Sequence, residues 1–290
     1  MKVMITGANG TIGTDLVDQF SKKNEVFAFY RTYNLAVKKI KNKNIKWIRQ
    51  DLKNEIKNNF KPDVIIHSVV THPFAKKNSL KDYINSNIIS LKNVVDFAIK
   101  KQVKYFIYLS SFQVYGKVNN FQLDENTVIN KPTILGATKL LGEKIIQSQK
   151  LNYIIIRLPG VVSYLNKDPR RPWINKIIND LKSNKNIEVY NSNKLFNNFI
   201  DTSEIHRFIE HIIKHRLINK EIINFSASTP KKLSTVIKFL KEKINSKSKI
   251  IFKKEKTVSF FISNKKLKKI FSFNTLSVKK LLTDFLNKSS

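Results

Sequence analysis

Three of the seven glycines in this chain, Gly7, Gly10 and Gly13, lie within the eight residues Thr6–Gly13. An apolar run at residues 3–5 precedes them, as in a short strand, and apolar residues at helical spacing follow from residue 12 to residue 20. Glycine between a strand and a helix lets the backbone approach an anion, which the free N–H groups of the helix N-terminus attract. The pattern predicts a site for the pyrophosphate of a dinucleotide, with an ordinary tight turn as the alternative.

The composition is that of a folded protein without disulfides. The chain has 290 residues, 41% of them hydrophobic, and no cysteine. This length allows one large domain or two modest ones. No apolar run approaches the ~20 residues of a membrane span. Because the first expected strand begins at Lys2, we expect no signal peptide, no membrane insertion and a cytoplasmic location.

The formal net charge of +33 raises the question of a nucleic-acid partner. Seven of the 54 basic residues are arginine, and the lysines are spread over the whole chain. This distribution indicates a general compositional bias instead of a binding patch, so we expect no specific nucleic-acid partner. His211 and His215 have helical spacing but lack nearby carboxylate or cysteine ligands beyond Glu210, so we expect no metal site.

Short apolar strands alternate with amphipathic helices over the first 160 residues, which predicts an α/β fold with a doubly wound parallel Rossmann sheet. The expected strands are 2–6, 26–30, 45–49, 64–68, 105–110 and 153–158, and the clearest helices are 84–100 and 137–149. We assign residues 1–160 and about 199–226 to the dinucleotide-binding domain, with a short extended segment at 224–226. Residues of about 161–198 and 227–290 would form a small C-terminal substrate-binding cap.

Several segments, taken in order, resemble one protein family. They are the glycine segment Thr6–Gly13, the triplet 50–52, the segment 62–67, Asn87, and the segment 110–116 with sequence SSFQVYG. Over nearly its whole length the chain resembles the extended short-chain dehydrogenase/reductase family, of the NAD-dependent epimerase/dehydratase type. The resemblance implies a nucleotide-linked sugar as substrate, a role in surface-polysaccharide synthesis, and a homodimer formed through helices 84–100 and 137–149.

The resemblance also implies which residues hold the cofactor. They are Gly7, Gly10, Thr11, Ile12, Gly13, Asp51, Leu52, Val69, Lys139 and Pro159. Selection of NAD usually requires a carboxylate at the end of the second strand. This chain has Arg31 there, which suits the 2′-phosphate of NADP(H), so we expect NADP(H) over NAD(H). The alternative is that Arg31 is a solvated surface side chain.

The chemistry of the family uses a serine or threonine, a tyrosine and a lysine. By resemblance, Ser111 and Lys139 match the serine and the lysine, but Leu135 occupies the tyrosine position. Leucine has no proton to donate. Three explanations stay open: another acid, with Tyr115, Thr133 or His72 as candidates; lost or changed chemistry on a retained cofactor site; or an altered sequence. The candidate catalytic residues are therefore Ser111, Lys139 and Tyr115.

By resemblance, Ser111 would contact the substrate. The family often has an arginine just before residue 199, which this chain lacks; Arg170 and Arg171 could replace it, with Trp173 available to stack on a base, and the alternative is that these three belong to a surface loop. Phe112 and Gln113 replace the acidic pair that sugar-nucleotide 4,6-dehydratases carry, so that activity is disfavoured. The sequence thus predicts an epimerase or reductase with atypical or impaired acid/base chemistry. The alternative is a non-catalytic dinucleotide-binding sensor or partner protein.

Overall fold

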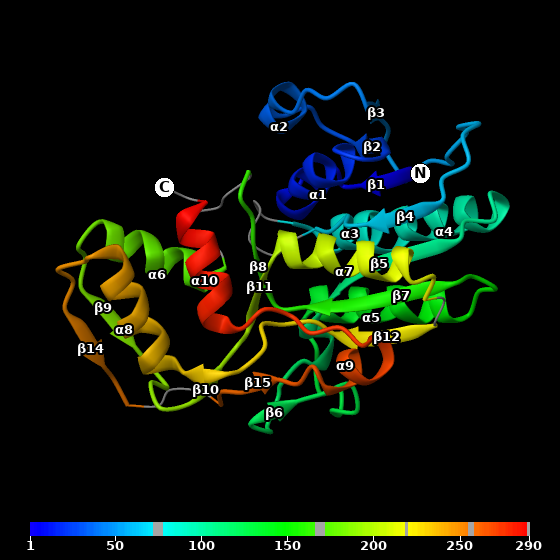
Figure 1. The fold of residues 1–290 in the computed structure, drawn as a ribbon. Helices are drawn as coiled ribbons and strands as arrows, with labels where there is room; N and C mark the ends of the chain where they lie inside the picture. The colour runs from blue at the N-terminus through cyan, green and yellow to red at the C-terminus, as the bar shows by residue number, and fades with distance from the viewer. Residues whose placement is uncertain (72–77, 166–171, 218–219, 255–257, 289–290) are drawn as a thin grey trace.

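The computed structural model describes residues 1–71, 78–165, 172–217, 220–254 and 258–288. A seven-stranded sheet with every strand parallel forms its centre, in the order β12-β7-β5-β4-β1-β2-β3 (Figure 1). The strands are β1 (Lys2–Thr6), β2 (Glu25–Tyr30), β3 (Ile45–Arg49), β4 (Val64–His67), β5 (Tyr105–Ser111), β7 (Tyr153–Leu158) and β12 (Glu221–Asn224). The predicted doubly wound parallel sheet is confirmed, and the extended segment expected at 224–226 lies earlier, at 221–224.

The strand order reverses between β1 and β4. From β1 the chain proceeds outward through β2 to β3, and from β4 it proceeds in the other direction through β5 and β7 to β12. Diverging connections at such a point open a crevice beyond the carboxyl ends of the strands, where ligands of doubly wound sheets bind. The glycine segment follows β1 directly and therefore lies at this reversal.

Helices cover both faces of the sheet, and each face has its own apolar core. On one face, α1 (Thr11–Ser21) and α7 (Thr202–Lys214) contribute Leu16 and Phe208 to the larger core. On the other face, α4 (Ser90–Lys100) and α5 (Ile134–Gln147) contribute Val94 and Ile146. Burial on both faces explains why the central strands β1, β4, β5 and β7 are mostly apolar, whereas the edge strand β3 is only partly buried. A short α2 (Leu35–Lys39) follows β2.

The helix expected at 84–100 differs from the prediction. The chain enters α3 (Leu80–Tyr83), passes through a π-helical segment, η1 (Ile84–Ile89), and continues as α4. Asn87 in the π-helical segment accepts a hydrogen bond from the Thr71 amide (2.9 Å) and donates one to Thr138 of α5 (2.9 Å). These two bonds hold the π-helical segment against the chain that follows β4 and against α5.

The second half of the chain adds smaller elements beyond the carboxyl ends of the main strands (Figure 1). Helices α6 (Trp173–Lys182), α8 (Leu233–Ile244) and α10 (Val278–Asn287) gather there, and α9 (Lys265–Phe271) lies beside β12. Four two-stranded pairs accompany them: β8 (Gly160–Val162) with β11 (Phe199–Asp201), β9 (Ile187–Val189) with β14 (Ile250–Phe252), β10 (Leu195–Phe196) with β13 (Lys231–Lys232), and β6 (Gln122–Leu123) with β15 (Phe261–Ile262). The division into a dinucleotide domain and a substrate cap stays a prediction.

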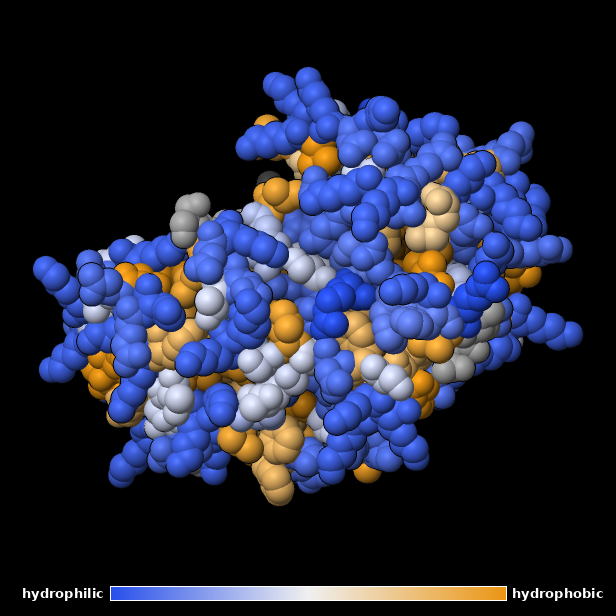
Figure 2. All heavy atoms as spheres, viewed as in Figure 1, coloured by the Kyte–Doolittle hydropathy of each residue, from blue (hydrophilic) through white to orange (hydrophobic). Residues whose placement is uncertain are grey.

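Hydrophilic side chains cover much of the face drawn in Figure 2, with apolar areas between them. Within the described part of the chain, no helix is both long and apolar enough to cross a membrane. No group of three or more described acidic or histidine side chains is arranged to hold a metal ion.

Candidate functional site

The glycine segment forms a tight loop whose shape requires glycine at two positions. Gly7 has a φ of +68°, and a side chain on it would meet Ser68 and the amide of Val69, 3.0–3.1 Å away. A Cβ on Gly13 would lie 2.1 Å from the Gly7 carbonyl oxygen, so α1 can press against the loop only without it. The Gly10 amide donates to the same carbonyl (2.9 Å) and closes the turn.

The N-terminus of α1 is free to bind an anion. Gly10 is its N-cap, no side chain caps the helix, and the first turn holds no acidic residue. The N–H groups of Thr11 and Ile12 therefore have no partner within the helix, and the helix dipole places partial positive charge there. A pyrophosphate suits this loop, because the loop lies at the reversal of strand order and the helix that follows has no capping side chain.

The adenosine end of the expected site lies beyond β2 and β3. Arg31 is exposed directly after β2, and the loop that follows is tied to the glycine loop, since Asn9 donates to the Thr32 carbonyl (2.5 Å). Asp51 follows β3, accepts from the Lys53 amide (3.1 Å) and keeps part of its carboxylate exposed. Leu52 beside it is buried. These positions agree with the expected contacts, which stay predictions.

Lys139 lies in the interior between β4 and β5. Its ammonium donates to the carbonyl oxygens of Leu109 (2.9 Å) and Val69 (3.3 Å) and lies 4.6 Å from the centre of the Tyr108 ring. The side chain is buried. Burial lowers the pKa of Lys139 from 10.5 to about 7, although the nearby Glu143 carboxylate acts to raise it. Val69, whose amide is close to Gly7, thus connects this lysine with the glycine loop.

Ser111 and Leu135 lie at the same end of the sheet. Ser111 ends β5, is half-buried, and accepts a hydrogen bond from the Gln113 amide (3.2 Å). Helix α5 begins three residues before the predicted position because Thr133 caps it through the Gly136 amide (3.3 Å). Leu135 therefore lies in the first turn, where it is buried. Pro159 follows β7 at this same sheet edge.

Tyr115 is placed away from the role of a replacement acid. It lies in a 3-10 turn, η2 (Phe112–Tyr115), and is fully buried. Its hydroxyl donates to the Asn224 side chain (2.8 Å), and its ring lies 4.8 Å from the Arg157 guanidinium. Burial is the main cause that raises the pKa of Tyr115 to about 12. We therefore assign Tyr115 a structural role that connects η2 with the end of β12.

Sequence reasoning missed a buried ion pair behind Lys139. Glu143, one turn further along α5, accepts from Arg157 Nε (3.0 Å) and Nη2 (2.6 Å), and from the Ser110 hydroxyl (2.6 Å). Both charged residues are buried. An arginine inside an otherwise apolar strand, and a glutamate four residues after the lysine, were the available signals.

Asp15 is a second residue that sequence reasoning missed. This buried carboxylate of α1 accepts from the Ser163 hydroxyl (2.9 Å), the amides of Tyr164 (2.7 Å) and Leu165 (3.0 Å), and the Thr202 hydroxyl (2.5 Å). It joins the helix of the glycine loop to the segment after β8 and to the start of α7. An acid within the apolar half of α1 was the only signal in the sequence.

Of the remaining residues that the sequence singled out, the structure describes Trp173 and Thr133. Trp173 begins α6, is partly exposed, and meets Phe196 edge to face at 5.9 Å. Thr133 is the exposed cap of α5. Arg170, Arg171 and the candidate acid His72 lie outside the described residues.

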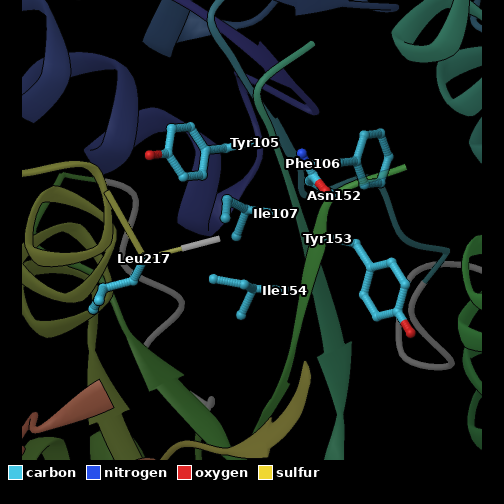
Figure 3. A pocket seen from close by; sticks show the side chains of 7 residues that line it. All are labelled: Tyr105, Phe106, Ile107, Asn152, Tyr153, Ile154 and Leu217. Carbon is cyan, nitrogen blue, oxygen red and sulfur yellow. The ribbon is translucent and has the colours of Figure 1, made fainter. Parts of the chain in front are cut away.

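A small crevice lies at the amino ends of β5 and β7, whereas the glycine loop lies at the carboxyl end of β1. It is lined by residues at the start of β5 and β7, and by Leu217 after α7 (Figure 3). Tyr105, Ile107 and Ile154 point to one side of the sheet, and Phe106 and Tyr153 to the other (Figure 3). The lining has no charged side chain, so we attribute the crevice to imperfect packing.

Sheet topology and glycine loop together define a dinucleotide-binding protein of the doubly wound class. Residues 3–225 match the model of the NAD dependent epimerase/dehydratase family, and the chain belongs to that family.

Relatives agree with this assignment. A putative UDP-glucose 4-epimerase of Methanocaldococcus jannaschii is 22% identical over 270 residues, covering 87% of this chain and 85% of the relative. The capsular polysaccharide biosynthesis protein CapD of Staphylococcus aureus is 23% identical over 187 residues, covering 55% of this chain and 28% of CapD. The structure of Bordetella bronchiseptica WbmG in complex with NAD is similar, with a TM-score of 0.82, 16% identity, and coverage of 99% and 93%.

Proposed function

We propose that this protein is a dinucleotide-dependent epimerase or reductase that acts on a nucleotide-linked sugar in surface-polysaccharide synthesis, with atypical acid/base chemistry. The observation that carries the proposal is the glycine loop, which leaves the α1 N-terminus bare at the reversal of strand order. Family membership supports a nicotinamide dinucleotide. The names of the relatives, a UDP-glucose 4-epimerase and a capsule biosynthesis protein, support the substrate and the setting.

The residues divide the work as follows. Gly7, Gly10 and Gly13 let the loop and the first turn of α1 hold the pyrophosphate, and the nicotinamide, when bound, accepts and returns a hydride. The Ser111 hydroxyl is at the end of β5, where it can orient a substrate oxygen. Leu135 is buried in the first turn of α5 and contributes no proton.

Binding and turnover are to be measured separately. Titration calorimetry with NAD(H) and NADP(H) tests the cofactor site, and a panel of nucleotide sugars assayed for product tests the activity. Ser111→Ala should lower turnover and leave dinucleotide affinity within about twofold. If Ser111→Ala leaves a measured turnover unchanged, our assignment of the site is wrong.

We infer a preference for NADP(H) over NAD(H). No acid ends β2, and the exposed Arg31 follows it. A hollow beside α2, the short helix that follows β2, is lined by Tyr33, Lys38, Lys41 and Lys43 and adds positive charge to this side of the sheet. Arg31→Ala should weaken NADPH binding about tenfold and NADH binding less than twofold. Equal losses for both would contradict the preference.

We further propose a homodimer formed through η1, α4 and α5. Ile84, Ile89 and Leu141 on these helices are large apolar side chains with 39–50% of their surface exposed, which a partner copy would cover. Light scattering should give twice the mass of 33.8 kDa, and Leu141→Lys should shift the protein toward monomer. Arg170, Arg171 and Trp173 stay our proposed contacts to the substrate, and a cytoplasmic location stays a prediction.

The second candidate is a non-catalytic dinucleotide-binding sensor or partner protein. Leu135 favours it, because the proton-carrying tyrosine of the family is replaced by an apolar side chain. Tight dinucleotide binding without turnover on any sugar nucleotide, together with turnover in Leu135→Tyr, would select this candidate over the enzyme.

A further inference from the structure

We propose that Lys139 itself takes up and returns the proton of the reacting hydroxyl, in place of the absent tyrosine. The inference rests on the proposed function, and it assigns this lysine a role beyond contacting the cofactor. Lys139 follows Leu135 by four residues, so the two side chains lie on one face of α5, one turn apart. The group nearest along the helix to the missing phenol is therefore an amine.

The hydrogen bonds of Lys139 suit a neutral amine as well as an ammonium. Its nitrogen donates to two main-chain carbonyls, Leu109 O and Val69 O. A neutral amine has two N–H groups, which these carbonyls satisfy, and a lone pair in the remaining direction. An ammonium carries its third proton in that direction. Uptake and release of a proton thus require no change in the two bonds that hold the side chain.

The surrounding charges leave Lys139 without a carboxylate of its own. On α5, Glu143 is bound at both oxygens by Arg157 of β7 and at one by Ser110 of β5. The other titratable groups facing the lysine are His67 of β4 and Tyr108 of β5, both buried and both favoured in their neutral forms.

The pKa of Lys139, lowered to about 7 by burial, agrees with this arrangement. A group that titrates near neutral pH is suited to general acid–base catalysis. Arg157 pairs with the Glu143 carboxylate, which acts to raise the pKa of the lysine but forms no described ion pair with it.

Other described candidates are less suited. Ser111 and Thr133 carry hydroxyls that do not titrate near neutral pH, and the Tyr115 hydroxyl is directed to Asn224. Among the described residues at this end of α5, Lys139 remains as the group that can exchange a proton.

The proton and the electrons balance in the proposed step. The O–H bond of the substrate hydroxyl breaks, and its proton joins the lone pair of the Lys139 nitrogen. The C–H bond on the same carbon breaks, its electron pair leaves as hydride to the nicotinamide ring, and a C=O bond forms. In the return direction, the Lys139 ammonium gives the proton back to the oxygen.

The first test is a direct titration of Lys139 in the free protein. Lysine side chains labelled with 15N are followed by NMR from pH 5 to pH 11, and the Lys139 signal is identified by its absence in Lys139→Arg. We expect it to titrate near pH 7. Lys144→Arg, which replaces an exposed lysine of the same helix, serves as the control and should remove a different signal while leaving the Lys139 signal in place.

The second test separates proton transfer from charge. Lys139→Arg keeps the cation but cannot release a proton at neutral pH, so kcat should fall about 10³-fold while dinucleotide affinity changes less than fivefold. Adding Leu135→Tyr to Lys139→Arg should restore at least tenfold, because the phenol then carries the proton beside a fixed cation. The oxidative kcat of the unmodified protein should rise with pH through about 7.

Three results would overturn the inference: titration of Lys139 above pH 9, retention of more than a tenth of kcat in Lys139→Arg, or dinucleotide binding with turnover only after Leu135→Tyr. The first two leave the proposed enzyme intact. The third leaves the cofactor site intact and selects the non-catalytic candidate, whereas failure to bind any dinucleotide rejects the proposed function and this inference together.

Discussion

Glu143→Gln tests whether the interior behind the site depends on a compensated charge. The substitution keeps the shape of the side chain but removes the negative charge that faces Arg157. The arginine residue is 6% exposed and makes its two described ionic hydrogen bonds to this carboxylate, at 3.0 and 2.6 Å. Breaking a buried ion pair by removing one partner costs about 3–5 kcal/mol, because the other charge stays buried. We expect a loss of this size in the free energy of unfolding.

The measurement is urea and thermal unfolding followed by circular dichroism. In a chain of this length about 1 kcal/mol corresponds to roughly 2 °C, so the midpoint should fall by about 6–10 °C. Asp96→Asn, which breaks the exposed Lys92–Asp96 pair on α4, is the matched control and should cost about 0.5 kcal/mol or less. A double variant with Glu143→Leu and Arg157→Met should recover most of the loss. If Glu143→Gln costs less than about 1 kcal/mol, our account of the pair is refuted.

Three further predictions concern α1 and Lys139. In Gly13→Ala, the new Cβ would lie 2.1 Å from the Gly7 carbonyl, so calorimetry should show at least tenfold weaker dinucleotide binding, and unaltered binding would contradict the loop geometry. Asp15→Asn should speed hydrogen exchange of residues 163–165 and cost about 2–3 kcal/mol, whereas Asp18→Asn, which changes a partly exposed acid on the same helix, should change neither. Because the pKa of Lys139 is lowered from 10.5 to about 7, the native state binds fewer protons than the unfolded chain between these values. Stability relative to Lys139→Met should therefore rise with pH across that window, by at most about 1.4 kcal/mol per unit, and level off below about 7, where both states carry the proton; a flat difference across the window would refute the shift.

Much of the fold could be predicted because it depends on local patterns. The strands expected at 2–6, 45–49 and 153–158 have the predicted bounds. Strands 2–6 and 153–158 are mostly apolar and almost fully buried, which makes them easy to recognise, whereas the edge strand 45–49 is only partly buried. The glycine loop was predictable for a similar reason, because its geometry depends on residues within one strand-to-helix turn. The family assignment followed from such segments taken in order.

Other features depend on partners far apart in the chain. The helix expected at 84–100 contains a π-helical turn, in which Asn87 bonds to Thr71 and Thr138. The spacing of apolar residues along the sequence does not reveal either bond. Tyr115 was a plausible acid by sequence, but its hydroxyl is bound by Asn224, 109 residues later.

The sequence by itself therefore determined the sheet class, the position of the dinucleotide loop and the absence of a phenol at residue 135, because each depends on residue identity or on short-range order. Only the tertiary structure determined which groups surround residue 135 and the lysine one turn after it. It buried Lys139 against two carbonyls and directed Glu143 to Arg157, two arrangements that arise only when distant strands come together. The acid/base properties of a side chain are set by burial and neighbouring charge, which sequence spacing does not describe.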